Sequence, residues 1–298
     1  MSVHPEPGGQ LLVTGASGFT GKHLQFVAMA HGLRVVCLTS DVRDMDALKA
    51  EIAPTDPAYV VHLAGISNTQ CEDRRLLQEV NVQGTHNLLQ ALVDTGKTPQ
   101  RVLLASSVLV YGSSPTSPVT EDHDLVPFNP YAASKIDMEA AASKFSSRLP
   151  ICVVRPFNYS GVGQSTSFLI PKLVDHFANK RKTVELGNIG VRREFNDVRY
   201  VCEVYVRLLL ADRCDRVYNV CCGRAYTIKD VLRTLETTTG HKILVEINPN
   251  FVRANDIMFL YGSTELLEAT IGSQLNSGDM LREMLAWMVD RCNRDGSV

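Results

Sequence analysis

The sequence predicts an α/β fold: a Rossmann-type, doubly wound parallel sheet with a smaller C-terminal α/β substrate lobe. Short apolar runs alternate with helix-like stretches through the first half of the chain, and a glycine turn directly follows the first run. Strands that are apolar on both faces and alternate with helices are typical of a parallel sheet covered on both sides. The strands are expected at residues 10–13, 34–38, 59–63, 102–105 and 151–154, and the helices at 22–30, 45–51, 78–94 and 131–148.

The pattern changes after residue 155, where loops separate shorter elements. Helices are expected at 168–179, 201–211, 228–238, 264–269 and 279–292, and strands near 184–186, 217–220 and 242–247. Because no linker-like segment separates the lobes, the chain should cross between them more than once. We assign residues 10–160 to the Rossmann domain, with about 191–215 returning to it, and residues 161–190 and 216–298 to the substrate lobe.

The composition excludes several classes of partner. The 298 residues carry a formal net charge of −2, so there is no broad positive field for nucleic acid or an anionic membrane, although local arginines could hold a small anion. No apolar run is long enough to span a membrane and residues 1–9 are unlike a signal peptide, so we expect a cytoplasmic protein. The eight cysteines form no CxxC pair and no metal-ligand spacing, so we expect reduced, mostly buried thiols and no metal site.

The turn at Gly15, Gly18 and Gly21 is typical of a dinucleotide site. The first glycine allows a tight turn, the second lets backbone amides approach a pyrophosphate, and the third packs helix against strand. A structural turn without a ligand is the alternative. A kinase-type P-loop is excluded, because His23 follows Lys22 where Ser or Thr would be required.

The end of the second predicted strand bears on the choice of dinucleotide. Dinucleotide folds usually hold the ribose 2′-hydroxyl there with an acidic residue. This chain has small polar residues at 39–40, followed by Asp41 and then Arg43. The nearby arginine favours NADP(H), and an Arg43 that is merely solvated is the open alternative.

One predicted helix start carries a candidate catalytic pair. Asn129 is a good N-cap and Pro130 a good first helical residue, so Tyr131 lies in the first turn and Lys135 one turn later on the same face. An ammonium beside a phenol lowers the pKa of the phenol, which would suit Tyr131 to proton exchange near neutrality. Ser107, just after a predicted strand, is the third member of the candidate set.

Six motifs stand in the order found in extended short-chain dehydrogenases/reductases that act on nucleotide sugars, the NAD-dependent epimerase/dehydratase superfamily. They are Thr14-Gly-x-x-Gly-Phe-x-Gly21, Val-His-Leu-Ala-Gly at 61–65, Asn-Val-Gln-Gly-Thr at 81–85, Ser-Ser-x-x-Val-Tyr-Gly at 106–112, Tyr131-x-x-x-Lys135 and Arg-Pro-Phe-Asn at 155–158. The resemblance covers nearly the whole chain. Within the superfamily, the stretch from 155 to 220 is most similar to GDP-4-keto-6-deoxy-D-mannose reductases.

The resemblance implies a role for each candidate residue. Tyr131 would be the proton donor, Lys135 would lower its pKa and hold the nicotinamide ribose, and Ser107 would hydrogen-bond the C4 oxygen of the sugar. The cofactor, NADP(H) or NAD(H), would contact Gly15, Ser17, Gly18, Phe19, Gly21, Asp41, Val42, Leu63, Ala64, Gly65, Asn81, Tyr131, Lys135 and Pro156. The substrate would contact Ser107, Asn158, Glu185, Arg193 and Arg253.

Arginine suits the substrate diphosphate, because its planar guanidinium pairs with two phosphate oxygens. Glu185 is the candidate for guanine, whose N–H groups need an acceptor. Ordinary solvated surface charges are the alternatives for Glu185, Arg193 and Arg253.

By resemblance, the chain reduces a nucleotide-linked 4-keto-6-deoxyhexose, most closely GDP-4-keto-6-deoxy-D-mannose, to GDP-D-rhamnose or its C4 epimer with NAD(P)H. Family dehydratases carry an acid/base pair where this chain has Val108 and Leu109, so dehydration is not expected. A nucleotide-sugar 4-epimerase with tightly bound NAD is the first alternative, and a non-catalytic redox sensor the second. The resemblance also implies a homodimer through the helices at 78–94 and 131–148, for which covering the sheet is the alternative role.

Overall fold

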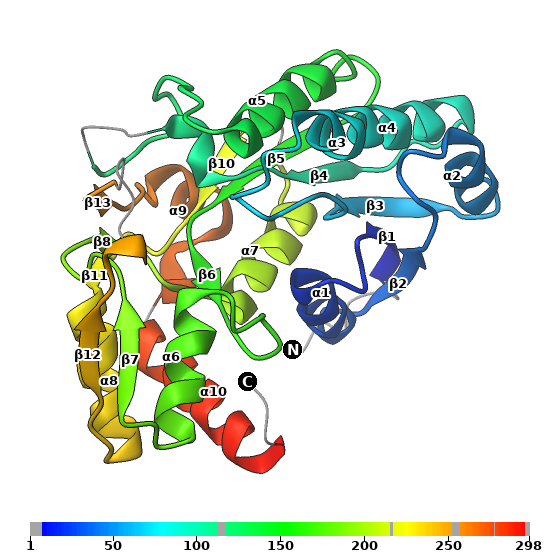
Figure 1. Ribbon diagram of the computed structural model, residues 1–298. Coiled ribbons are helices and arrows are strands. Elements are labelled where there is room, and N and C mark those ends of the chain that lie inside the picture. Colours follow the sequence, from blue (N-terminus) through cyan, green and yellow to red (C-terminus); the bar gives the residue numbers. More distant parts are fainter. Residues whose placement is uncertain (1–7, 113–116, 215–216, 252–256, 277, 296–298) are drawn as a thin grey trace.

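The computed structural model describes residues 8–112, 117–214, 217–251, 257–276 and 278–295. Its largest feature is a six-stranded sheet in the order β10-β5-β4-β3-β1-β2 (Figure 1). Every neighbouring pair in this sheet is parallel. The strands are β1 (Gly8–Thr14), β2 (Leu33–Leu38), β3 (Pro57–His62), β4 (Arg101–Ala105), β5 (Ile151–Pro156) and β10 (Val217–Val220).

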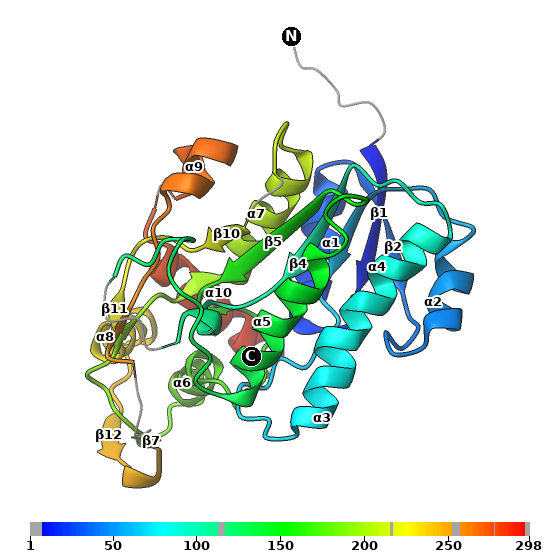
Figure 2. The same ribbon diagram turned by 90° about the horizontal axis from the view of Figure 1, so that it is seen from above.

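Helices cover both faces of this sheet, as Figures 1 and 2 show. On one face, α1 (Phe19–Ala30) and α7 (Val198–Leu210) pack on each other and on the buried strand residues. On the other face lie α2 (Met45–Ile52), α4 (Gly84–Asp94) and α5 (Pro130–Ser143). The predicted fold class, a Rossmann-type parallel sheet between two helix layers, is confirmed.

The predicted helix at 78–94 differs from the observed one at its start. The helical segment begins earlier, as α3 (Arg74–Leu77), and continues through a π-helical stretch, Gln78–Gln83, before α4. Asp73 caps this segment, because its carboxylate accepts a hydrogen bond from the backbone N–H of Leu76 at 3.0 Å. Single π-helical turns inside α-helices occur often at functional sites, and this one contains Asn81.

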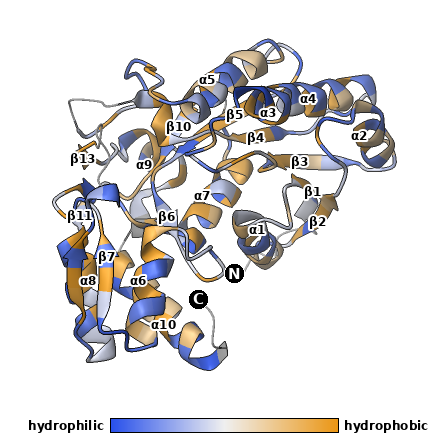
Figure 3. Ribbon diagram, viewed as in Figure 1, coloured by the Kyte–Doolittle hydropathy of each residue, from blue (hydrophilic) through white to orange (hydrophobic). Residues whose placement is uncertain are grey.

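A second hydrophobic core lies beside the sheet. It is built from α6 (Leu169–Ala178), α8 (Ile228–Thr239) and α10 (Met280–Asp295), with β7 (Thr183–Leu186) paired to β12 (Leu244–Ile247). The apolar residues that α6 and α7 bury form orange bands along both helices in Figure 3. Thr227 and Asp230 form a reciprocal capping box that fixes the start of α8.

The chain passes between the two cores several times. β8 (Arg192–Arg193) pairs with β11 (Tyr226–Thr227) and β13 (Phe259–Leu260), whereas β9 (Asn196–Asp197) pairs with β6 (Tyr159–Ser160), the strand that follows β5. After α7 the chain enters β10, which pairs with β5 and completes the main sheet. The domain boundaries predicted from the sequence had placed residues 217–220 in the substrate lobe. α9 (Glu265–Ile271) then packs against α7 and β10. Within the described residues, no helix is both long and apolar enough to cross a membrane.

A buried chain of hydrogen bonds joins β1, β3 and α4. Thr14 Oγ1 lies 2.7 Å from Nδ1 of His62, whose Nε2 lies 2.9 Å from Thr85 Oγ1. Thr85 gives its own proton to the carbonyl of Asn81, so His62 must donate from Nε2 and accept at Nδ1. Burial lowers the pKa of His62 to about 3, and the ring therefore stays neutral in the folded protein. The sequence interpretation of His62 as strand-end polar packing agrees with this arrangement.

Replacement of His62 by Gln should weaken the acid sensitivity of the fold. The pKa of His62 is about 3 in the folded protein and 6.5 ordinarily, so below pH 6.5 the unfolded chain binds a proton at His62 that the folded chain does not bind. The free energy of unfolding therefore decreases as the pH falls below 6.5. Between pH 7 and pH 5 the wild type should lose roughly 2 kcal/mol more free energy of unfolding than His62→Gln. Urea titrations at both pH values measure this difference, and equal losses in the two proteins would contradict it.

Candidate active site

The predicted site residues follow the carboxyl ends of neighbouring strands. β1 ends at Thr14, β3 at His62, β4 at Ala105 and β5 at Pro156. Since these strands are parallel, their ends meet at one edge of the sheet. From β1 the chain goes first to β2 on one side and then to β3 on the other, so the strand order reverses at the boundary between the neighbouring strands β1 and β3. Open α/β sheets bind ligands in the crevice at such a reversal.

The glycine turn closes tightly against the end of β3. Gly15 has a positive φ of 67°, and a Cβ there would lie 2.6 Å from the backbone nitrogen of Ala64. A Cβ on Gly21 would lie 2.7 Å from the Cα of Ala16, so α1 can start this close to β1 only with glycine at that position. Phe19, the first residue of α1, is partly buried against the sheet core.

The start of α1 fits a diphosphate. Gly18 is its N-cap, Ser17 and Gly18 are exposed, and among the described residues no side chain caps this end and no acid stands in the first turn. The helix dipole and the unpaired N–H groups are therefore available to an anion.

The loop after β3 is fixed by Asn81. The Oδ1 atom of Asn81 accepts the backbone N–H of Ile66 at 2.8 Å, and its Nδ2 donates to Ser134 Oγ on α5 at 2.9 Å. The N–H groups of Leu63 and Ala64 donate to the carbonyl and Oγ1 of Thr14 at the end of β1, so this loop is held on both sides. A Cβ on Gly65 would lie 3.0 Å from Asn81 Oδ1 and 3.7 Å from Lys135 Nζ, so glycine keeps this approach to Lys135 open.

The segment after β2 is built around an ion pair. Arg43 donates to both carboxylate oxygens of Asp41, at 3.0 Å from Nε and 2.6 Å from Nη2. Val42 is buried beneath Gly84, where a Cβ would touch the side chain of Val42 at 2.5 Å. The structure thus pairs Arg43 with Asp41, and each of the two side chains remains 49% exposed.

Ser107, Tyr131 and Lys135 lie close together, between the end of β4 and the first turns of α5. Asn129 caps α5 through a 2.7 Å hydrogen bond from the N–H of Ala132, with Pro130 as the first helical residue. Ser107 lies close enough to Tyr131 for its side chain to lower the pKa of the Tyr131 phenol. Lys135 donates from Nζ to the carbonyl of Ala105, two residues before Ser107, at 2.9 Å.

Burial acts on the pKa of Tyr131 in the direction opposite to the lowering that we expect from Lys135. Burial raises the pKa of Tyr131 to about 12, and only the neighbouring Ser107 side chain opposes that rise. Lys135 is itself buried, which lowers its pKa to about 8 against the opposing charge of Glu139. At neutral pH the phenol therefore keeps its proton, and Lys135 is mostly charged.

Glu139 and Arg155 form a buried ion pair beside this set. Arg155 donates to both oxygens of Glu139, at 3.0 Å from Nε and 2.6 Å from Nη2, and Ser106 Oγ donates to Oε1 of the same carboxylate. Glu139 follows Lys135 by one helical turn, and Ser106 precedes Ser107. Sequence reasoning missed Glu139, whose only signal was its i+4 spacing from Lys135.

The predicted substrate residues occupy different parts of the structure. Asn158 follows β5 with an exposed side chain, and its carbonyl accepts two hydrogen bonds from Asn196. Arg193 is half-buried on β8, and Arg253 lies outside the described residues. Glu185 is exposed on β7, where its carboxylate accepts a hydrogen bond from Asn248 at 3.1 Å.

Glu194, which was also not predicted from the sequence, joins three segments next to Arg193. Its buried carboxylate accepts backbone N–H groups from Cys222 and Gly262, both at 2.8 Å, and the Nδ2 of Asn196 at 3.1 Å. Burial raises the pKa of Glu194, while these three hydrogen bonds oppose the rise. The carboxylate thus fixes β8 against the ends of β10 and β13.

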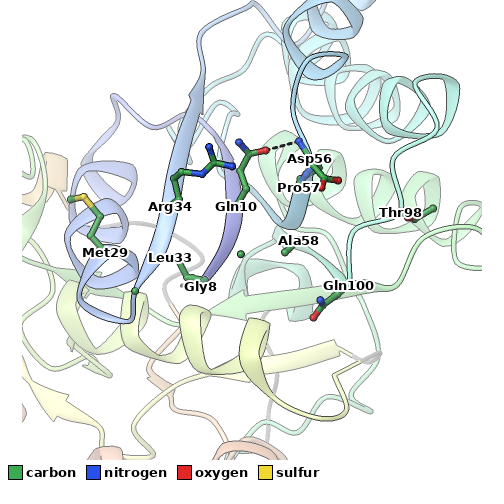
Figure 4. Close-up of a pocket in the computed structure, with 12 residues that line it drawn as sticks. Gly8, Gln10, Met29, Leu33, Arg34, Asp56, Pro57, Ala58, Thr98 and Gln100 are labelled. Carbon is green, nitrogen blue, oxygen red and sulfur yellow. Dashed lines mark hydrogen bonds between the residues drawn. The ribbon is translucent and has the colours of Figure 1, made fainter. Parts of the chain in front are cut away.

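A pocket of about 800 Å³ lies at the opposite edge of the sheet (Figure 4). Its lining includes Gly8, Leu33 and Pro57, which are the first residues of β1, β2 and β3. Gln10 Oε1 accepts the N–H of Asp56 across it at 2.8 Å. This pocket is therefore separate from the edge where the predicted site residues meet.

Comparison with known proteins assigns the chain to a family. It belongs to the NAD dependent epimerase/dehydratase family, whose profile matches residues 11–221. The prediction of an NAD(P)-dependent enzyme of this superfamily is confirmed.

Two curated relatives are similar over most of the chain. GDP-6-deoxy-D-talose 4-dehydrogenase of Aggregatibacter actinomycetemcomitans is 33% identical over 270 residues, which cover 89% of this chain and 92% of the relative. GDP-6-deoxy-D-mannose reductase of Pseudomonas aeruginosa is 34% identical over 279 residues, which cover 88% and 91%. The solved structure of RMD from P. aeruginosa complexed with NADPH superposes with a TM-score of 0.88 at 30% identity, covering 96% of this chain and 98% of that one.

Substitution of Gly15 by Ala should damage the site far more than the same change at Gly96. Both glycines have a φ of 67°, but a Cβ on Gly96 meets no described atom within 4 Å. Gly96→Ala should cost about 1 kcal/mol of stability for the backbone conformation alone. Gly15→Ala should cost at least about 2 kcal/mol more, because the backbone at Ala64 must move, and should abolish NADH binding. Urea unfolding and fluorescence titration test both effects, and similar behaviour of the two variants would refute the role of the close approach.

Proposed function

We propose that this protein reduces a nucleotide-linked 4-keto-6-deoxyhexose at C4, with GDP-4-keto-6-deoxy-D-mannose as substrate and GDP-D-rhamnose as product. The observation that carries the proposal is the convergence of Ser107, Tyr131 and Lys135 at the carboxyl edge of a dinucleotide-type sheet. The names of the two curated relatives support a GDP-linked 6-deoxyhexose.

The protein's own groups suit proton delivery to an alkoxide. A reduced nicotinamide, when bound, supplies the hydride that converts the C4 ketone to an alkoxide and leaves the cofactor oxidised. Tyr131, with a pKa of about 12, is protonated at neutral pH and gives its proton to that more basic oxygen. Ser107 donates a hydrogen bond to the same oxygen, and Lys135, with a pKa of about 8, supplies positive charge near the phenolate that remains.

The residues after Ser107 argue against dehydration. Val108 and Leu109 begin a 3₁₀ turn, Val108–Tyr111, in which the N–H of Leu109 donates to Ser107 Oγ at 3.2 Å. Neither side chain can move a proton. Reduction therefore fits the site better than the elimination that family dehydratases perform.

The cofactor is proposed to lie along the edge described above. Its diphosphate would contact Gly15, Ser17 and Gly18 at the start of α1, with Phe19 and Gly21 behind them. Its adenosine would lie near Asp41 and Val42. The nicotinamide end would lie among Leu63, Ala64, Gly65, Asn81, Tyr131, Lys135 and Pro156.

The substrate is proposed to extend from Ser107 toward Asn158 and Arg193, with Arg253 also on the diphosphate and Glu185 on the base. The buried Glu194 supports the role of Arg193, because it anchors β8 against two neighbouring strand ends. Two further parts of the proposal come from the sequence: a cytoplasmic location, since no apolar run is long enough to span a membrane, and a homodimer through α4 and α5, which the resemblance implies.

Tyr131→Phe should lower kcat for reduction by at least about 100-fold, because the variant keeps the ring but has no proton to give. The assay follows the loss of NADH or NADPH absorbance after addition of GDP-4-keto-6-deoxy-D-mannose. Binding of the cofactor, measured separately by fluorescence, should change little.

Tyr205→Phe is the matched control. Tyr205 is also fully buried, and its hydroxyl has no hydrogen-bond partner among the described residues. This variant should therefore keep its activity. A wild type that oxidises neither cofactor with this substrate, or a fully active Tyr131→Phe variant, would refute the proposal. A 4-epimerase, in contrast, would need no added cofactor.

A further inference from the structure

The backbone at the end of β2 binds the carboxylate of Glu51. Immediately after Leu38, the backbone N–H of Thr39 donates to both carboxylate oxygens of Glu51, at 2.9 and 3.1 Å. The Thr39 hydroxyl adds a 2.7 Å hydrogen bond and the N–H of Ser40 one of 3.0 Å. These hydrogen bonds outweigh desolvation and lower the pKa of Glu51 to about 2, so the carboxylate is charged at any physiological pH.

This carboxylate lies where a dinucleotide fold receives the adenosine ribose. Leu38 pairs with Thr14, the last residue of β1, so Thr39 and Ser40 continue beside the glycine turn. In such folds the end of the second strand distinguishes a ribose 2′-hydroxyl from a 2′-phosphate. Acceptors favour the hydroxyl, whereas amides and arginines favour the phosphate.

The neighbouring charges act in the same direction. Arg43 is the first cationic residue after the end of β2, and Asp41 binds it through both carboxylate oxygens. Residues 39–51 carry four acidic side chains and two basic ones, and the second base, Lys49, is paired with Asp94 at 2.6 Å. A 2′-phosphate would have to displace Glu51 from the backbone amides and would meet net negative charge.

We propose that Glu51 makes this protein select NAD(H) over NADP(H). The proposal rests on the proposed function, since it concerns the cofactor of the same site. It replaces the preference for NADP(H) that Arg43 suggests in the sequence. The proposed preference for NAD(H) also differs from the cofactor in the P. aeruginosa RMD structure, which contains NADPH. Glu51 acts as a specificity-determining residue from α2, outside the strand end itself.

Fluorescence titration of NADH and NADPH, without any sugar, tests the proposal. The wild type should bind NADH at least about tenfold more tightly than NADPH, as expected for one displaced and repelled anion. Glu51→Ala removes the carboxylate and opens the amides of Thr39 and Ser40, so its Kd for NADPH should fall by about tenfold while that for NADH changes little. Glu51→Gln, which keeps one acceptor, should shift the ratio in the same direction and decides the matter if the alanine variant does not fold.

Asp46→Asn is the matched control, because it removes the same charge from α2 without a hydrogen bond to the end of β2 in the described structure. The ratio of its Kd for NADH to its Kd for NADPH should equal that of the wild type. Equal or tighter NADPH binding by the wild type, an unchanged ratio in both Glu51 variants, or an equal shift in Asp46→Asn would overturn the proposal. If the protein bound neither NADH nor NADPH, the proposed function would be overturned as well. Failure of the selectivity alone is thus distinguishable from failure of the proposed function.

Discussion

The buried ion pair between Arg155 and Glu139 is the interaction on which the geometry of this site depends. Their side chains are only 5% and 10% exposed, and two parallel hydrogen bonds join them. Glu139 fixes the face of α5 that carries Lys135. Ser106 donates to the same carboxylate and so fixes the chain that leaves β4 just before Ser107. Arg155 stands directly before Pro156, where the chain turns toward Asn158.

The same guanidinium reaches the last strand of the sheet. Its Nη1 donates to the hydroxyl of Tyr111 at 2.9 Å, and Tyr111 donates to the side-chain oxygen of Asn219 on β10 at 2.7 Å. A buried pair of this kind contributes little net stability, but loss of one partner leaves an uncompensated charge that costs about 3–5 kcal/mol. The hydrophobic cores set the layers of the fold, and these polar groups set the positions of catalytic elements within them.

Local patterns in the sequence were sufficient for much of this structure. The apolar runs predicted every strand from β1 to β5, and Asn129 with Pro130 predicted the start of α5 that orients Tyr131. These features depend on neighbouring residues alone. The π-helical stretch at Asn81 was not predicted, because it depends on how α3 and α4 meet the rest of the fold.

The long-range polar contacts could not be read from the sequence. Glu194 is distant in the chain from Cys222 and Gly262, and Glu51 meets Thr39 only because α2 folds back along β2. The pKa of Tyr131 shows the same limit: the spacing to Lys135 indicated a nearby charge but not the burial that dominates.

Transfer of deuterium from cofactor to sugar tests the proposed function most directly. The protein would be incubated with GDP-4-keto-6-deoxy-D-mannose and NADH or NADPH deuterated at the reactive C4 position of the nicotinamide, and the product examined by NMR. The proposed function predicts one deuterium at C4 of the hexose for each cofactor oxidised. A converted sugar without deuterium and without net oxidation of added cofactor would contradict it, because that is the outcome for an epimerase that regenerates its own NAD.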